Sequence, residues 1–157
     1  MEPLRKTKSK LTMEEQPIQI YRHKLPVQLR FSDVDQFGHV NNSVLFSLYD
    51  LAKTEYFKAV LADITRKYDI IPVVANINAD FIHPVLFGDK IAVETSVARL
   101  GNKSFTVMHQ IVNVKTKCVV SVCRTVMVCF SIKIGDSVEI PDEIRRRIKE
   151  YEANILL

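Results

Sequence analysis

Most of the fold can be inferred from one segment, Leu29–Phe57, which reads LRFSDVDQFGHVNNSVLFSLYDLAKTEYF. Its first part, Ser32–Asn42, is rich in Asp, Asn, Gly and Ser, and these residues favour turns and helix caps. Apolar residues then recur at steps of three and four over residues 43–61, which is the helical period. The segment therefore predicts a loop that leads into a core helix, with Asn42 or Ser43 as the N-cap.

Strand patterns flank this segment on both sides. Before it, apolar and polar residues alternate over Leu25–Phe31, as in a half-buried strand. After it, Pro72 interrupts the chain, and four β-rich runs joined by turns follow at residues 73–85, 90–100, 103–114 and 117–132. A final segment from Pro141 has acidic residues in its first turn and predicts a short surface helix. This order predicts an α+β fold, in which a five-stranded antiparallel sheet wraps a long central helix.

The length and composition fit one globular domain. The chain has 157 residues, of which 47% are hydrophobic and 25% charged, with only 4 Gly and 6 Pro, so collagen-like and wholly disordered classes are excluded. Residues 1–20 are polar and aperiodic and predict a flexible leader, and residues 21–157 predict a single domain that ends in the short helix.

The net charge and the hydropathy of the chain indicate which classes of partner and which cellular location to expect. The net charge of +4 is modest and lacks the dense basic stripe of a nucleic-acid-binding protein. No apolar run is long enough to span a membrane, and the N-terminus lacks the apolar core of a signal peptide. We therefore expect a cytoplasmic protein with neither nucleic acid nor membrane as a partner.

The cysteines and two of the histidines suggest structural roles. Cys118, Cys123 and Cys129 lie in apolar, β-rich sequence without a CxxC pair, which favours reduced strand or core thiols over a metal site or disulfides. His83 and His109 also fall in β-rich runs, with no metal-binding partner at a useful spacing. We expect both histidines to be structural, and we expect no metal and no cofactor.

Side chains that can carry chemistry are concentrated between Asp33 and Asn42. Two carboxylates, an imidazole and two asparagine amides fall within these ten residues. Turn formation and helix capping explain some of them, with Gly38 expected at positive φ. Capping needs only one polar side chain, however, and here five lie beside an apolar helix, which favours a binding or catalytic loop.

The segment Leu29–Phe57 resembles the start of the hotdog-fold acyl-CoA thioesterases of the 4-hydroxybenzoyl-CoA thioesterase-like family. Members of that family often carry a D-x-D-x-x-G-H-V-N-N motif between their first strand and their central helix, and this motif spans Asp33–Asn42 here. A later run, residues 74–107, also resembles the next strands of the family, including a Pro-x-x-x-Gly-Asp turn that starts at Pro84. The resemblance extends over about residues 25–130 and implies the hotdog fold.

The resemblance implies hydrolysis of a thioester between an acyl group and coenzyme A or an acyl-carrier phosphopantetheine. The catalytic carboxylate of the family maps to Asp35, which acts either as a nucleophile or as a general base, and both roles stay open. His39 and Asn41 are expected as auxiliary catalytic residues, and Asp33 is expected to be structural.

Substrate-binding residues also follow from the resemblance. Backbone N–H groups could stabilise the thioester oxyanion, either in the loop Gly38–Asn41 or at Ile70 and Ile71, which match a family position with that role. Lys103 and Ser104 match positions that contact the phosphates of coenzyme A in relatives.

Two features leave the partners partly open. Gly101 and Asn102 replace basic residues that often precede the lysine in the family, so an acyl carrier protein remains an alternative to coenzyme A. Family sites lie at a dimer interface, and the β-rich strand Cys118–Ile132 predicts an edge that pairs with a second copy, in a homodimer or homotetramer. The alternative function is a non-catalytic hotdog module that binds acyl-CoA or acyl carrier protein.

Overall fold

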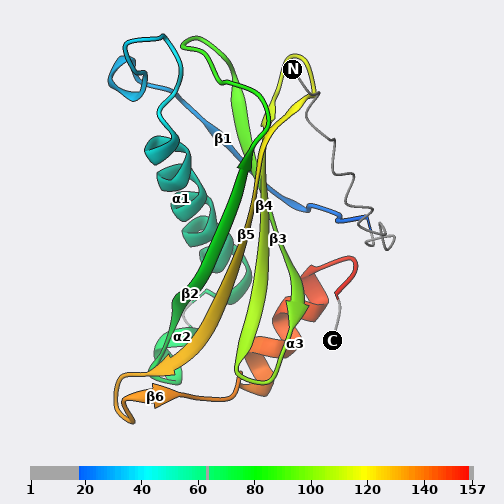
Figure 1. Ribbon diagram of the computed structural model, residues 1–157. Helices are drawn as coiled ribbons and strands as arrows, with labels where there is room; N and C mark the ends of the chain where they lie inside the picture. Colours follow the sequence, from blue (N-terminus) through cyan, green and yellow to red (C-terminus); the bar gives the residue numbers. More distant parts are fainter. Residues whose placement is uncertain (1–17, 63, 156–157) are drawn as a thin grey trace, which may run out of the picture.

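The computed structural model describes residues 18–62 and 64–155 (Figure 1). Residues 1–17, most of the expected leader, lie outside this description. The strands are β1 (His23–Val27), β2 (Ile70–Phe81), β3 (Ile91–Leu100), β4 (Ser104–Asn113), β5 (Val119–Ser131) and β6 (Asp136–Ser137). The helices are α1 (Asn42–Leu61), α2 (Ile64–Lys67) and α3 (Asp142–Tyr151), and Phe31–Asp33 forms a 3₁₀ turn.

The strands form one antiparallel sheet in the order β1-β3-β4-β5-β2, and the two-residue β6 pairs with the end of β5. The long helix α1 runs along one face of this sheet (Figure 1). The α+β fold with five main strands and a long central helix is therefore confirmed. The sequence had missed only the short helix α2 and the two-residue β6.

The position of β5 corrects the expected pairing edge. The run Cys118–Ile132 was expected to offer an edge, but β5 lies between β4 and β2 and is covered on both sides. The two edges are β1 and β2, and the longer of them is β2, on which Ile71, Val74 and Ile77 are 41%, 47% and 40% exposed. Pro72 also lies inside β2 rather than interrupting the chain, because an edge strand tolerates the loss of a backbone donor.

Helix α1 forms where the apolar period predicted it. Its fully buried side chains follow one face against the sheet: Leu45, Tyr49, Ala52, Tyr56, Val60 and Leu61. The N-cap is Asn41, one residue earlier than expected, because its Oδ1 accepts a 2.9 Å hydrogen bond from the Ser43 N–H. Its exposed side is mixed, with charged Asp50 and Lys58 beside exposed Leu51. Among the described helices none is both long and apolar enough to cross a membrane.

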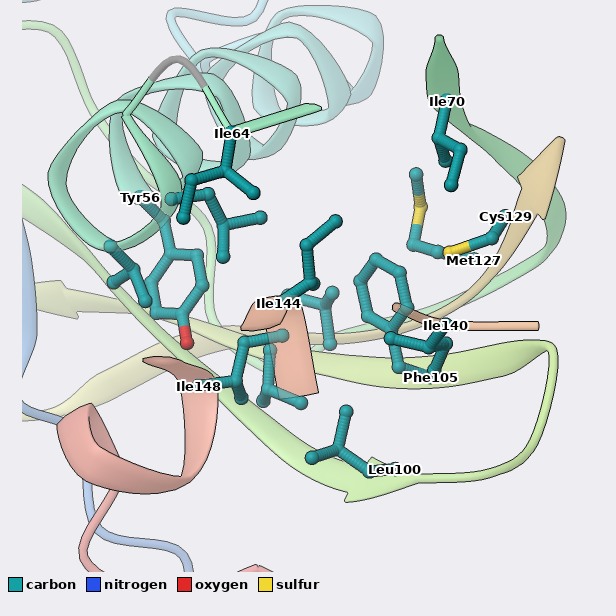
Figure 2. Packing of buried hydrophobic residues seen from close by; sticks show 14 residues of the cluster. Tyr56, Ile64, Ile70, Leu100, Phe105, Met127, Cys129, Ile140, Ile144 and Ile148 are labelled. Atoms are coloured by element: carbon teal, nitrogen blue, oxygen red, sulfur yellow. The ribbon is translucent and has the colours of Figure 1, made fainter. Parts of the chain in front are cut away.

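Helix α3 closes one end of the space between α1 and the sheet. Figure 2 shows Ile144 and Ile148 pointing into a cluster with Tyr56 of α1 and Phe105 of β4. Ile148 is fully buried, and such a side chain contributes about 1.5–3 kcal/mol to folding. The predicted surface helix is therefore amphipathic and forms part of the core.

Two expected strands have different bounds. The first strand ends at Val27 instead of Phe31, because Phe31 already begins the 3₁₀ turn. The run expected at residues 73–85 is the strand Ile70–Phe81. The ladder ends there because the N–H groups of Ile82 and His83 both donate to the same acceptor, the Val120 carbonyl oxygen, at 2.9 and 3.0 Å.

The connections divide between the two ends of the sheet. The loop before α1 and the loop after β2 lie together at one end, whereas α2, β6 and the β3–β4 turn lie at the other (Figure 1). This division decides which of the expected site residues can meet within one chain.

Candidate active site

The loop before α1 is a closed turn built around Asp35. The Asp35 N–H donates to the His39 carbonyl at 2.8 Å, and the Gly38 N–H donates back to the Asp35 carbonyl at 3.0 Å. Gly38 has φ +78°, as expected, a conformation that residues with a side chain rarely adopt. Asp35 Oδ1 accepts hydrogen bonds from the N–H groups of Phe37 at 2.8 Å and His39 at 3.2 Å. The turn thus holds the carboxylate by one oxygen, and Oδ2 has no partner among the described residues.

Asp33 has the opposite environment, although it lies only two residues away. Its side chain is buried, and it accepts hydrogen bonds from the Arg30 N–H at 2.7 Å and from the Arg30 guanidinium at 3.1 Å. The backbone hydrogen bond, together with the guanidinium, holds the pKa of Asp33 below its usual value. These contacts agree with the expected structural role.

Hydrogen bonds fasten the Asp35 loop to the segment that follows β2. The Val40 N–H donates to the Val85 carbonyl at 2.8 Å, and His39 and Leu86 form an antiparallel bridge. A pocket of about 390 Å³ lies between these two segments. Its polar lining consists of Asp35, His39, Asn41, Asn42 and His83, and its apolar lining includes Leu45, Phe81 and Ile82. The pocket can therefore hold a group with an apolar tail beside a free carboxylate oxygen.

The three expected catalytic residues, Asp35, His39 and Asn41, all line this pocket. The side-chain oxygen of Asn41 is occupied as the helix cap, because it accepts from both the N–H and the hydroxyl of Ser43. Asn41 therefore shapes the start of α1 besides lining the pocket.

The backbone donors expected in the loop are already used. The N–H groups of Gly38, His39, Val40 and Asn41 donate to acceptors within the protein, namely the Asp35 carbonyl, Asp35 Oδ1, the Val85 carbonyl and the Asp33 carbonyl. None of these four has a hydrogen free for a thioester oxyanion without breaking such a bond.

The other expected binding residues lie at the far end of the same chain. Ile70 and Ile71 start β2, whereas Phe81 at its other end lines the pocket, and the 11 steps between Ile70 and Phe81 span roughly 36 Å. Lys103 and Ser104 lie in and after the β3–β4 turn, and the Lys103 ammonium donates to the Ser137 carbonyl at 3.1 Å. These four residues lie together at one end of the sheet but apart from the Asp35 pocket of their own chain.

The two histidines expected to be structural differ in the structure. His109 is buried, its ring contacts the Thr95 hydroxyl at 3.0 Å, and burial lowers its pKa to about 3, so it is a neutral core residue as expected. For His83 the expectation was wrong, because His83 lies beyond β2, is exposed and lines the pocket. The pairing of residues 39 and 86 that creates this position joins distant parts of the sequence, and the only local signal was Pro84 directly after it.

The cysteines occupy two environments. Cys123 and Cys129 are buried in the core, where burial raises the pKa of the Cys129 thiol to about 11, whereas Cys118 is exposed. Among residues 18–62 and 64–155, no three His, Cys, Asp or Glu side chains are grouped so that they could hold a metal ion.

Comparison with known proteins defines the class. Residues 29–148 match the model of the thioesterase-like superfamily, so the chain belongs to that superfamily. Similar solved structures include a Thermus thermophilus thioesterase in complex with coenzyme A and zinc, with 29% identity, a TM-score of 0.71, and coverage of 82% of this chain and 98% of that chain. A predicted thioesterase from Bacillus stearothermophilus has 26% identity, a TM-score of 0.72, and coverage of 83% and 96%.

A curated relative gives a more limited match. The uncharacterized protein YsmA of Bacillus subtilis is 28% identical over 83 residues, which cover 53% of this chain and 56% of the relative. The match therefore spans little more than half of that relative's length. Together with the structural likenesses, the superfamily match confirms the resemblance to hotdog-fold thioesterases that the sequence suggested.

Proposed function

We propose that this protein is an acyl thioesterase, which hydrolyses an acyl-CoA or acyl-carrier thioester to the free acid and the thiol. The observation that carries the proposal is the free Oδ2 of Asp35 at a pocket with both polar and apolar lining, in a chain of the thioesterase-like superfamily. A carboxylate held by one oxygen in a rigid turn can attack a carbonyl carbon, or accept a proton from water, without first being reorganised.

The full site requires a second copy of the chain. The uncovered edge of β2 presents unpaired backbone groups and exposed Ile71, Val74 and Ile77, which favour pairing with another strand. Two β2 strands that pair antiparallel around their midpoints would set the partner's Ile70 opposite Phe81. The chain is then at least a homodimer.

This arrangement would supply what each chain lacks at its own pocket. The N–H groups in the Asp35 loop are committed to the protein, whereas an outward N–H at the start of β2 stays available for a thioester oxyanion if the pairing of the two β2 strands stops short of that end. Lys103 and Ser104 lie at the same end as Ile70, so the partner would also bring an ammonium and a hydroxyl for substrate phosphate. We infer that Asp35 of one chain works with Ile70, Ile71, Lys103 and Ser104 of the other.

A panel of acyl-CoA and acyl-carrier thioesters, assayed with a reagent for free thiols, tests the activity. Asp35→Asn keeps the size of the side chain but cannot act as an anionic nucleophile or a base, so kcat should fall by about 10²- to 10⁴-fold. Circular dichroism should show an unchanged fold.

Asp50→Asn serves as the matched control, because Asp50 is an exposed aspartate on α1 outside the pocket. It should keep the wild-type rate. An Asp35→Asn protein with a kcat close to wild type would contradict the catalytic role. A wild-type protein that binds acyl-CoA but releases no thiol from any substrate would instead identify a non-catalytic binding module.

A further inference from the structure

We propose that His83 is a second catalytic residue of the pocket, a general acid that protonates the sulfur of the departing thiol. The proposal rests on the proposed thioesterase function. It concerns cleavage of the carbon–sulfur bond, which Asp35 alone does not assist.

The backbone holds His83 rigidly at the pocket wall. Its N–H donates to the Val120 carbonyl at 3.0 Å, and Pro84 directly after it restricts His83 to extended backbone conformations. The antiparallel bridge of His39 with Leu86 and the hydrogen bond of Val40 to Val85 hold the segment after β2 against the loop before α1, and Asn42 and His83 both line the pocket between them. His83 is thereby placed beside the first turn of α1, on the segment that faces the Asp35 loop.

The ring of His83 is free to act. Among the described residues it has no hydrogen-bonding partner, and it is exposed at the pocket. The other two histidines differ, because His109 is buried against Thr95 and the half-buried His23 packs edge-on against Tyr56, with 5.7 Å between the ring centroids. Of the four histidines in the chain, only the two exposed ones, His39 and His83, line the pocket.

The proposed base and the proposed acid lie on different segments of the pocket lining. Asp35 is on one segment and His83 is on the other, so a thioester bound between them contacts both. His39 belongs to the Asp35 turn itself, where its backbone N–H and carbonyl close the turn. His83 is therefore the histidine placed to reach the side of the substrate away from the carboxylate.

The reaction balances with these two groups and water. When Asp35 acts as a base, the water oxygen bonds to the carbonyl carbon and its proton passes to Asp35 Oδ2. The carbon–sulfur bond then breaks with its electron pair on sulfur, and the His83 imidazolium gives its proton to that sulfur. When Asp35 is the nucleophile, the same proton transfer accompanies formation of the anhydride, so the role of His83 does not depend on that choice.

Few charged groups influence His83. Asp35 and His39 face it from the loop, and α1 contributes only uncharged residues to the pocket. Asp80, the nearest acid on β2, lies on the opposite face of the sheet from Phe81, because neighbouring strand residues alternate. Asp35 is therefore the one carboxylate among the residues that line the pocket with His83.

The test compares two leaving groups on one acyl group, the alkyl thiol N-acetylcysteamine and the more acidic aryl thiol thiophenol. An alkyl thiolate is more basic than an aryl thiolate, so its departure gains much more from a proton given to the sulfur. His83→Gln should therefore lower kcat/KM for the alkyl thioester by about 10²-fold and leave the aryl thioester within about threefold of wild type.

His83→Asn provides a second neutral variant, and Lys149→Gln on the exposed face of α3 provides a control that should keep both rates. Thermal unfolding checks that each variant folds. Equal losses on both thioesters would show that His83 only supports the site, and unchanged rates on both would show that it takes no part; either result overturns the proposal. A wild-type protein inactive on both thioesters would overturn the thioesterase function itself, and the role of His83 with it.

Discussion

At the scale of single residues, the loop before α1 shows how backbone geometry gives two similar carboxylates different roles. Both oxygens of Asp33 are occupied by Arg30, and its side chain is buried. Asp35 keeps one oxygen free, because the turn closed by Gly38 directs only two N–H groups at the other. The first carboxylate therefore stabilises the loop, and the second is available for chemistry.

Asp33→Asn should destabilise the protein near neutral pH. The pKa of Asp33 is lowered in the folded state, so its ionised form contributes stability above the unfolded pKa of about 3.9, and this contribution is lost as the pH falls through the lower folded pKa. We expect a loss of about 1–3 kcal/mol in the free energy of unfolding at pH 7. Urea unfolding at pH 7 and at pH 3 measures it.

The difference between Asp33→Asn and wild type should shrink at the lower pH. Asp50→Asn is the comparison, since exposed Asp50 pairs only with Lys53, and it should cost less than about 0.5 kcal/mol. A penalty for Asp33→Asn that is the same at both pH values would contradict the role of the ionised carboxylate.

At the scale of elements, the end of α3 lies against the part of β3 that β1 does not cover. β1 pairs with residues 91–95 of β3, so the following edge of β3 lacks a strand. Glu152 occupies this place: its carboxylate accepts hydrogen bonds from the Val97 N–H at 2.8 Å, the Ser96 hydroxyl at 2.8 Å and the Tyr56 hydroxyl at 2.6 Å. One side chain thereby ties α3 to both the sheet and α1.

Tyr56→Phe should weaken this attachment. The variant keeps the packing of the ring but removes a donor from a buried carboxylate, which should cost about 1–3 kcal/mol in the free energy of unfolding. Tyr151→Phe is the matched control, because the Tyr151 hydroxyl has no hydrogen-bonding partner among the described residues. Chemical denaturation compares the two, and an equal, small effect of both would show that the hydroxyl of Tyr56 contributes little.

The sequence predicts the elements that depend on local patterns. The apolar period of α1 and the β-rich runs at residues 90–100 and 103–114 led to bounds within one residue of the structure. The strand β2 was displaced by several residues, because Pro72 signals a break unless the strand is known to lie at an edge. Strand order has no local signal, and this is why β5 was mistaken for the edge.

Some residues of the candidate site could likewise be predicted from local sequence, and others could not. Asp35, His39 and Asn41 could be predicted because they lie in one short, unusually polar loop, and the structure brings all three to the pocket. His83 could not be predicted, because it reaches the pocket through pairing between segments more than forty residues apart. Ile70 and Lys103 do not line the Asp35 pocket of their own chain, and only the proposed dimer would bring them to it.

At the scale of the whole molecule, the residues of the proposed shared site lie at the two opposite ends of the sheet. The pocket end has the carboxylate and two imidazoles, and the far end has the edge N–H groups and the ammonium of Lys103. Because β2 connects the two ends and is also the longer edge of the sheet, its pairing with a second copy would bring the two sets of residues together in a single step.

A charge on the β2 edge should separate the copies and abolish activity together. Ile77 lies in the middle of β2 and is 40% exposed, so Ile77→Glu places like charges close together across a two-fold axis. Sedimentation equilibrium should show wild type at about twice the 18.0 kDa of one chain and the variant at one chain. Ile134→Glu, at a side chain 71% exposed outside β2, should leave the assembly and the rate unchanged. The Ile77→Glu monomer keeps Asp35, His39 and His83 in place, so it should lose thioester turnover only because the partner's Ile70 and Lys103 are absent. A monomer that remains folded and fully active would rule out a site shared between two chains.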